Sequence, residues 1–171
     1  MKLFVAGVSH KTAPVEIREQ LAVQRSEVVD LARTVKLLGQ LDEMVLVSTC
    51  NRVEVYGTTR QTDSDIKSLL QLLCSEPRDL EPHIYLYEDA DAVRHLLRVA
   101  AGLDSMVLGE TEITGQIKNA YETAREAGLT GPVLNRLFQK AFQTTKKIRT
   151  RTAIGRGTAA YEGDPFRLVL A

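Results

Sequence analysis

Apolar positions along the first half of the chain form short runs that alternate with helically spaced stripes. The runs predict four strands, at residues 2–8, 44–47, 53–57 and 83–87. Between them, Pro14 begins one helical stretch, a stripe over residues 28–38 stops at Gly39, and another stripe covers residues 66–73. The order strand, helix, strand, strand, helix, strand matches the split β-α-β pattern of ferredoxin-like α+β folds.

The second half of the chain has only helical periodicity. Apolar stripes cover residues 93–100, 113–124 and 134–148, and the last stripe is the longest. Its final turns carry Lys146, Lys147, Arg149 and Arg151, which suit the C-terminal end of a helix. The pattern therefore predicts an α+β domain: a ferredoxin-like antiparallel sheet with additional helices and a long C-terminal helix.

Composition changes this picture little. A chain of 171 residues suits one compact domain, and 44% hydrophobic residues suffice for an ordinary core. Lys plus Arg and Asp plus Glu number 22 each, so no global positive field indicates a general nucleic-acid binder. The expected strands also lack an aromatic stacking pair for RNA. We expect neither a signal peptide nor a membrane span, and a cytoplasmic protein.

Cys50 is the strongest candidate for chemistry. It ends an apolar strand and is flanked by the polar residues Ser48, Thr49, Asn51 and Arg52. Catalytic groups often occupy such positions, because the strand fixes the backbone while the turn leaves the side chain reachable. A free thiol is ionised only to a few per cent at neutral pH. Arg52 is the nearest cation in sequence, and it would either favour the thiolate or bind a substrate carboxylate. The alternative is a buried, small apolar residue.

The other cysteine and the histidines carry weaker signals. Cys74 lies on the apolar stripe of its helix, which predicts a core position without chemistry. His83 is expected on the surface at a strand entry, and His10 follows the first strand and lines a site if one forms at the strand ends. His95 lies off the apolar stripe of its helix, so it is either a solvated residue or an acid/base group facing a cleft. These spacings match no metal site, and we expect none.

Two glycine-rich segments remain. Residues 102–110 are bracketed by two glycines, and the polar side chains in and after them are Ser105, Glu110, Glu112 and Gln116. This segment is either a plain helix connection or the wall of a site. Residues 155–160 (GRGTAA) superficially match the G-x-G-x-x-A dinucleotide fingerprint, but they follow a long helix instead of a strand. We therefore expect no cofactor-binding residues in this chain.

Three sequence blocks together resemble the glutamyl-tRNA reductase family, which catalyses the first step of the five-carbon route to tetrapyrroles (porphyrins). They are GVSHKTAP with EIRE at residues 7–19, STCNRVE at residues 48–54, and GLDSMVLGETEITGQ at residues 102–116. Their order and spacing make the resemblance specific, and it covers about residues 1–157.

The resemblance implies a catalytic role for Cys50 and His95. The Cys50 thiolate would attack the ester that joins glutamate to tRNA, and NADPH would reduce the resulting thioester to glutamate-1-semialdehyde. His95 matches the histidine that matters for activity in the family. Arg52 would bind the substrate's side-chain carboxylate by a two-point contact. The implied substrate-binding residues are Thr49, Asn51, Arg52, Ser105, Glu110, Thr111, Glu112 and Gln116.

The resemblance also implies parts that this chain lacks. Family enzymes continue through the connecting helix into an NADPH domain and a dimerisation domain, so we expect the NADPH site and the homodimer contacts outside this chain. We expect a catalytic domain over residues 1–150, including the start of the connecting helix, and a truncated or atypical tail over residues 151–171. A frameshift, a cloning scar or a naturally shortened gene would each produce such a tail. Alone, the chain would give at most thioester formation and ester hydrolysis.

Two other functions stay open from the sequence. One is a non-catalytic module that binds RNA or a small acidic ligand through the sheet. The other is a regulatory fragment that binds a full-length reductase through its exposed long helix.

Overall fold

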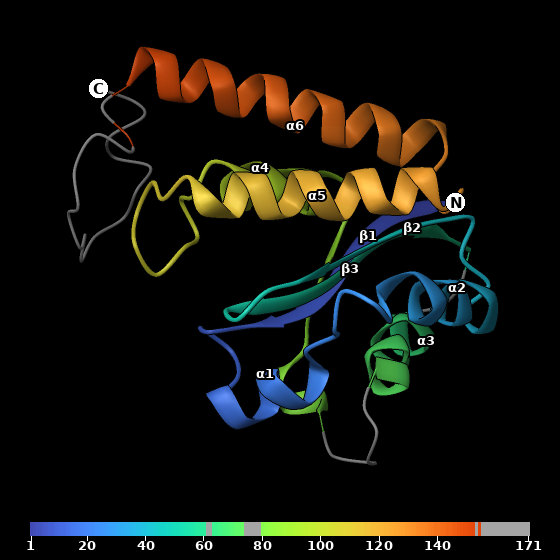
Figure 1. Ribbon diagram of the computed structural model, residues 1–171. Helices are drawn as coiled ribbons and strands as arrows, with labels where there is room; N and C mark the ends of the chain where they lie inside the picture. Colours follow the sequence, from blue (N-terminus) through green and yellow to red (C-terminus); the bar gives the residue numbers. More distant parts are fainter. Residues whose placement is uncertain (61–62, 74–79, 153, 155–171) are drawn as a thin grey trace.

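A computed structural model describes residues 1–60, 63–73, 80–152 and 154. Cys74 and the glycine-rich residues 155–160 lie outside the described residues, as does nearly all of the expected tail. The core of the fold is a four-stranded sheet with helices on both faces (Figure 1).

The sheet has the order β2-β3-β1-β4, and every neighbouring pair is antiparallel. Its strands are β1 (Lys2–Ser9), β2 (Glu43–Ser48), β3 (Arg52–Thr59) and β4 (Tyr85–Glu88). β1 and β2 therefore run in the same direction with β3 between them, which is the split arrangement that the element order predicts. The expected α+β class is confirmed.

One face of the sheet carries the short helices. They are α1 (Val15–Leu21), α2 (Val28–Leu38) and α3 (Asp63–Ser68), the last followed by a 3-10 turn at Leu69–Leu73. Gly39 ends α2 as predicted. The strand predicted to start at His83 is wrong at its beginning, because Glu81–His83 form a 3-10 turn and β4 starts at Tyr85. The fixed φ of Pro82 suits that turn.

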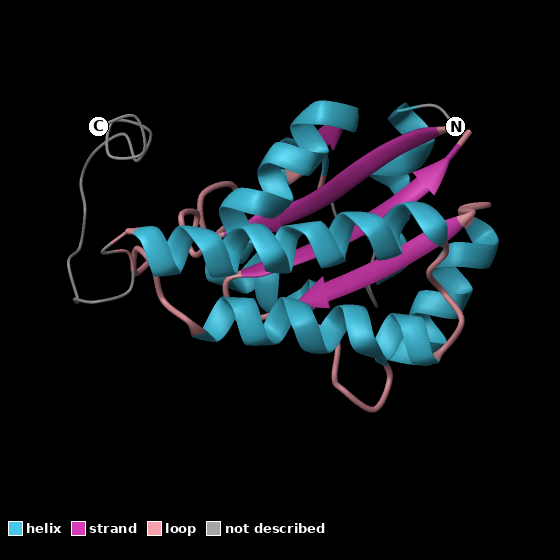
Figure 2. Cartoon of the chain, turned by 90° about the horizontal axis from the view of Figure 1, so that it is seen from above, coloured by secondary structure: helices cyan, strands magenta, loops and turns pink. Residues whose placement is uncertain are grey.

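The other face carries α4 (Asp89–Ala100), α5 (Glu112–Glu126) and the long α6 (Pro132–Arg151). Seen from above, α6 runs across the sheet with a helix on either side (Figure 2). Phe138 of α6 is fully buried and meets the Tyr56 ring edge-on, with centroids 5.5 Å apart. The long helix is therefore part of the domain core at its N-terminal half.

A carboxylate from the sheet caps the start of α6. Glu43, only 6% exposed, accepts hydrogen bonds from the backbone N–H groups of Gly131, Val133 and Leu134 at 2.7–3.0 Å. Free N–H groups and the positive end of the helix dipole both favour an anion at this place. The cap fixes the beginning of α6 against β2.

Because helices cover both faces of the sheet, its central strands have almost no solvent-exposed surface. β3 is buried at every position, including Arg52, Glu54, Thr58 and Thr59. Buried charges must be paired or hydrogen-bonded, so Arg52 and Glu54 depend on specific partners. None of the helices in the described residues combines the length and the apolarity that a bilayer span requires.

Candidate active site

The turn between β2 and β3 presents Cys50 to solvent on a fixed backbone. The Thr49 N–H donates to the Arg52 carbonyl at 2.9 Å, and the Thr49 hydroxyl oxygen accepts from the N–H groups of Asn51 (3.2 Å) and Arg52 (3.1 Å). Arg18 Nε of α1 donates to the Cys50 carbonyl at 3.2 Å. The thiol is exposed, whereas its backbone is held from two sides.

Cys50 opens into a pocket of about 100 Å³, which we call the Cys50 pocket. Its lining residues are Thr49, Cys50, Asn51, Arg52, Ser105, Glu110, Glu112, Ile113 and Gln116. Every substrate-binding residue predicted from the sequence lines it except Thr111, which is exposed immediately before α5. Ile113 was not foreseen, because its place on the apolar stripe of α5 indicated only core packing.

The glycine-bounded segment 102–110 forms one wall of this pocket instead of a plain connection. Gly102 and Gly109 have φ angles of +76° and +77°, and the Gly109 N–H donates to the Gly102 carbonyl at 2.9 Å. Only glycine adopts this conformation without strain. Arg149 of α6 fastens the end of the loop, with Nη2 donating to the Glu110 carbonyl at 2.7 Å and to the Thr114 hydroxyl at 2.9 Å.

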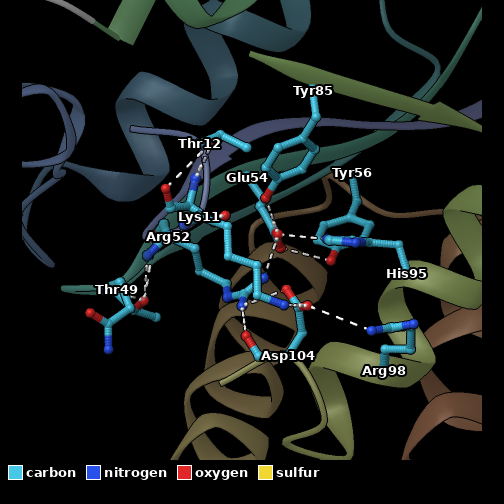
Figure 3. Close-up of polar contacts among 12 residues, drawn as sticks. Lys11, Thr12, Thr49, Arg52, Glu54, Tyr56, Tyr85, His95, Arg98 and Asp104 are labelled. Carbon is cyan, nitrogen blue, oxygen red and sulfur yellow. Dashed lines mark hydrogen bonds and ion pairs between the residues drawn. The ribbon is translucent and has the colours of Figure 1, made fainter. Parts of the chain in front are cut away.

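Arg52 lies beneath the pocket, and its terminal nitrogens are already engaged. It is 1% exposed; Nη1 donates to Glu54 at 2.8 Å, and Nη2 donates to the Asp104 carbonyl at 2.7 Å and to Oδ2 at 3.2 Å (Figure 3). Burial would lower the pKa of Arg52, but the Glu54 charge raises it above its ordinary value. The expected two-point contact with a substrate carboxylate would require breaking these bonds.

A fully buried carboxylate, Glu54, organises the residues behind the pocket. It accepts hydrogen bonds from Arg52 (2.8 Å), Tyr56 (2.7 Å), Tyr85 (2.5 Å) and His95 Nε2 (2.7 Å) (Figure 3). Burial alone would raise the pKa of Glu54, but the hydrogen bond and charge of His95 and the charge of Arg52 hold it well below its ordinary value. Burial and the Glu54 charge raise the pKa of both tyrosines. We call these five residues the Glu54 cluster.

Gly7 makes room for the Glu54 cluster. In the sheet register Gly7 of β1 lies opposite Glu54 on one side and Tyr85 on the other. A Cβ at this glycine would lie 2.7 Å from Glu54 Cγ. The Glu54 side chain therefore depends on the missing side chain at this position. Sequence reasoning missed this cluster, although a charged residue between Val53 and Val55 of a strand was a signal for it.

His95 faces a different pocket from Cys50. A cavity of about 490 Å³, which we call the Tyr87 pocket, is lined by Ser9, Lys11, Thr12, Tyr85, Tyr87, Asp91, Arg94, His95, Arg98 and Asp104. The expectation that His95 faces a cleft fits this position. The structure does not bring it into the Cys50 pocket, and the Arg52–Asp104 contact lies between the two cavities.

His10, which follows β1, is hydrogen-bonded to the turn that carries Cys50. Its backbone N–H donates to the Asn51 carbonyl at 2.9 Å, and its Nδ1 atom is buried with no hydrogen-bond partner among the described residues. Burial, helped by the charges of Arg52 and Lys11, lowers its pKa. Across the described part of the chain, no group of three or more His, Cys, Asp or Glu side chains is placed to hold a metal ion.

Comparison with known proteins agrees with the sequence blocks. Residues 6–152 match the family described as glutamyl-tRNAGlu reductase, N-terminal domain. Glutamyl-tRNA reductases of Magnetococcus marinus and Marinobacter nauticus are 44% and 45% identical, over 94% and 91% of this chain. The chain covers 39% and 37% of those relatives.

A solved structure supports the same family assignment. The glutamyl-tRNA reductase from Methanopyrus kandleri superposes with a TM-score of 0.77 and 34% identity, over 91% of this chain and 36% of that one. The chain therefore spans less than two fifths of the length of these relatives. This chain belongs to the family of glutamyl-tRNA reductase N-terminal domains.

Proposed function

We propose that this chain performs the thioester-forming step of a glutamyl-tRNA reductase, with Cys50 as nucleophile. One observation carries the proposal: the exposed Cys50 thiol opens into a small pocket whose other lining residues are polar or charged except Ile113. A nucleophile needs an accessible sulfur on a fixed backbone, and the Thr49 and Arg18 hydrogen bonds provide that backbone.

The proposed step exchanges an oxygen ester for a thioester. The Cys50 thiolate attacks the carbonyl carbon that joins glutamate to the terminal ribose of tRNA, a C–S bond forms, and the C–O bond to the ribose breaks. The ribose oxygen leaves and takes up a proton, which releases free tRNA. No oxidant or reductant is consumed in this step.

The pocket walls suit a glutamyl group with two charges. Glu110 and Glu112 provide negative charge for the substrate ammonium, and Gln116 already bonds Glu112 at 3.1 Å. We propose that Arg52 attracts the side-chain carboxylate through its charge, since both its terminal nitrogens are held by Glu54 and Asp104. Hydroxyl and amide donors of Thr49, Asn51 and Ser105 complete the same wall.

The hydride step is not assigned to the described residues. Every pair of neighbouring strands in their sheet is antiparallel, so they contain no two adjacent parallel strands joined by a helix, the unit that holds a dinucleotide. NADPH would supply hydride to the thioester when bound. We propose that residues beyond this chain would hold it, as in the longer enzymes.

Intact-protein mass spectrometry tests the proposal. After incubation with glutamyl-tRNA and rapid acid quench, the chain should gain the mass of one glutamyl residue, and peptide mapping should place it on Cys50. Cys50→Ser should abolish the adduct, and Cys74→Ser is the matched control that should retain it. Binding of tRNA without any adduct would instead favour a non-catalytic RNA-binding module.

A further inference from the structure

Strand β4 carries two stacked tyrosines that the strand pattern was expected to lack. The Tyr85 and Tyr87 rings are 5.3 Å apart and inclined by 28°, and the His95 ring lies 5.0 Å from Tyr87. Residues two apart in a strand share a face, so the pairing follows once β4 begins at Tyr85. Tyr87 is 40% exposed and lines the Tyr87 pocket. This is a surface on which a flat ring can stack.

Cations surround this aromatic surface. Lys11, Arg94 and Arg98 line the same pocket, and two carboxylates, Asp91 and Asp104, oppose them. Lys11 pairs with Asp104 and Arg94 pairs with Asp91, with the Lys11 and Arg94 side chains 51% and 63% exposed. The Arg94–Asp91 pair is exposed on both sides, and such pairs contribute little stability, so an incoming phosphate can replace the Asp91 carboxylate at low cost. Stacking surface and cations together are what single-stranded nucleic acids require.

The Tyr87 pocket adjoins the Cys50 pocket through one shared wall. Asp104 lines the first pocket and the next residue, Ser105, lines the second. Figure 3 shows Asp104 in contact with Arg52 and Lys11 on one side and with Arg98 on the other. A ligand in the Tyr87 pocket is thus separated from the glutamyl pocket only by this layer of side chains. The volume of the Tyr87 pocket, about 490 Å³, lies within the usual range for small-ligand sites.

We propose that the Tyr87 pocket binds the unpaired 3′-terminal nucleotide of the substrate RNA. The base stacks on Tyr87, and the phosphate contacts Lys11 and Arg94. The proposal rests on the proposed function, because the terminal nucleotide of a charged tRNA carries the ester that Cys50 would attack. With the base in one pocket and the glutamyl group in the other, the ester lies at the wall between them.

Two acyl substrates, one with and one without a nucleotide, distinguish the contribution of the Tyr87 pocket from that of the Cys50 reaction itself. Acylation of Cys50 is measured with glutamyl-tRNA and with a glutamate α-thioester that carries no nucleotide. In Tyr87→Ala and in Arg94→Ala, the ratio of the tRNA rate to the small-thioester rate should fall about tenfold. Tyr87→Phe should restore the ratio, because the stacking ring remains. Lys118→Ala removes a comparably exposed cation from α5 and should leave the ratio unchanged.

Measurement of RNA affinity tests the proposal independently of the acylation rates. The affinity for a short single-stranded RNA ending in an unpaired adenosine should fall about tenfold in Tyr87→Ala, and free AMP should compete only weakly. Tight AMP binding with no preference for the RNA would instead identify a mononucleotide site and overturn the proposal. Equal losses with both acyl substrates would also overturn it, since they would mean that Tyr87 acts only through His95. Absence of any Cys50 adduct with either substrate would contradict the proposed function, while the RNA affinities would still test this pocket.

Discussion

Glu54 accepts a hydrogen bond of 2.7 Å from His95 Nε2, across 41 residues of sequence. An ionised carboxylate can only accept, so Nε2 carries the hydrogen of this bond. The bond joins the buried centre of the sheet to the Tyr87 pocket. The same carboxylate also holds Arg52 under the Cys50 pocket, so one group positions side chains in both cavities.

Glu54→Gln should strongly destabilise the fold. The amide is neutral, so the Arg52 guanidinium stays buried without its main charge partner, and we expect a loss of about 3–5 kcal/mol of unfolding free energy. Urea denaturation at neutral pH measures it. Glu122→Gln breaks an exposed pair with Lys118 and should cost at most about 1 kcal/mol. Comparable losses of unfolding free energy in the two variants would mean that the Glu54 cluster stabilises the fold no more than an exposed ion pair does.

Asp104 should make stability depend on acid pH. Burial would raise its pKa, but the Lys11 hydrogen bond and the Arg52 charge lower it. Its stabilising contribution is therefore fully present above the ordinary unfolded value of about 3.9 and is lost as pH falls through the lowered folded value. Urea midpoints measured from neutral to acid pH should decline less steeply below about pH 4 in Asp104→Asn than in the parent chain. Parallel curves would show that Asp104 does not titrate with folding.

Gly7→Ala should disturb the Glu54 cluster through a single methyl group. The new Cβ would lie 2.7 Å from both Glu54 Cγ and the Val53 carbonyl oxygen. Overpacking of this kind costs about 1–3 kcal/mol. Gly115→Ala on α5 is the matched control, since nothing lies within 4 Å of its Cβ position, and a helical alanine should stabilise by up to about 1 kcal/mol. Thermal unfolding of the two variants should therefore shift in opposite directions, and a stabilised Gly7→Ala would refute the crowding argument.

Arg149→Ala should loosen the loop at residues 102–110. The variant loses the charge-assisted bonds to the Glu110 carbonyl and the Thr114 hydroxyl. Such bonds contribute about 1.5–3 kcal/mol each, so hydrogen exchange of the loop amides should accelerate by roughly tenfold or more. Lys147→Ala removes an exposed cation from the same helix and should leave this exchange unchanged. Equal exchange in both variants would show that the loop holds its shape without α6.

Local patterns predicted the elements but not the contacts among them. The α2 stop at Gly39 and the exposed turn at Cys50 follow from neighbouring residues alone, and both are observed. The burial of Arg52 depends on helices covering both faces of β3, which no short segment encodes. The Glu54 cluster depends on the register of β1 with two other strands, so Gly7 could be recognised only in three dimensions.

Because α6 is held at both ends, a small tilt of the helix moves the residues at its C-terminal end. Glu43 holds its first turn against β2, and Arg149 near its last turn holds the loop that walls the Cys50 pocket. At 1.5 Å per residue, the lever arm from Pro132 to Arg149 is about 25 Å, so a tilt of about 5° around the Glu43 end displaces Arg149 by about 2 Å. That displacement exceeds the tolerance of a hydrogen bond. The geometry of the Cys50 pocket is therefore set partly by the angle of a helix whose far end lies well away from the thiol.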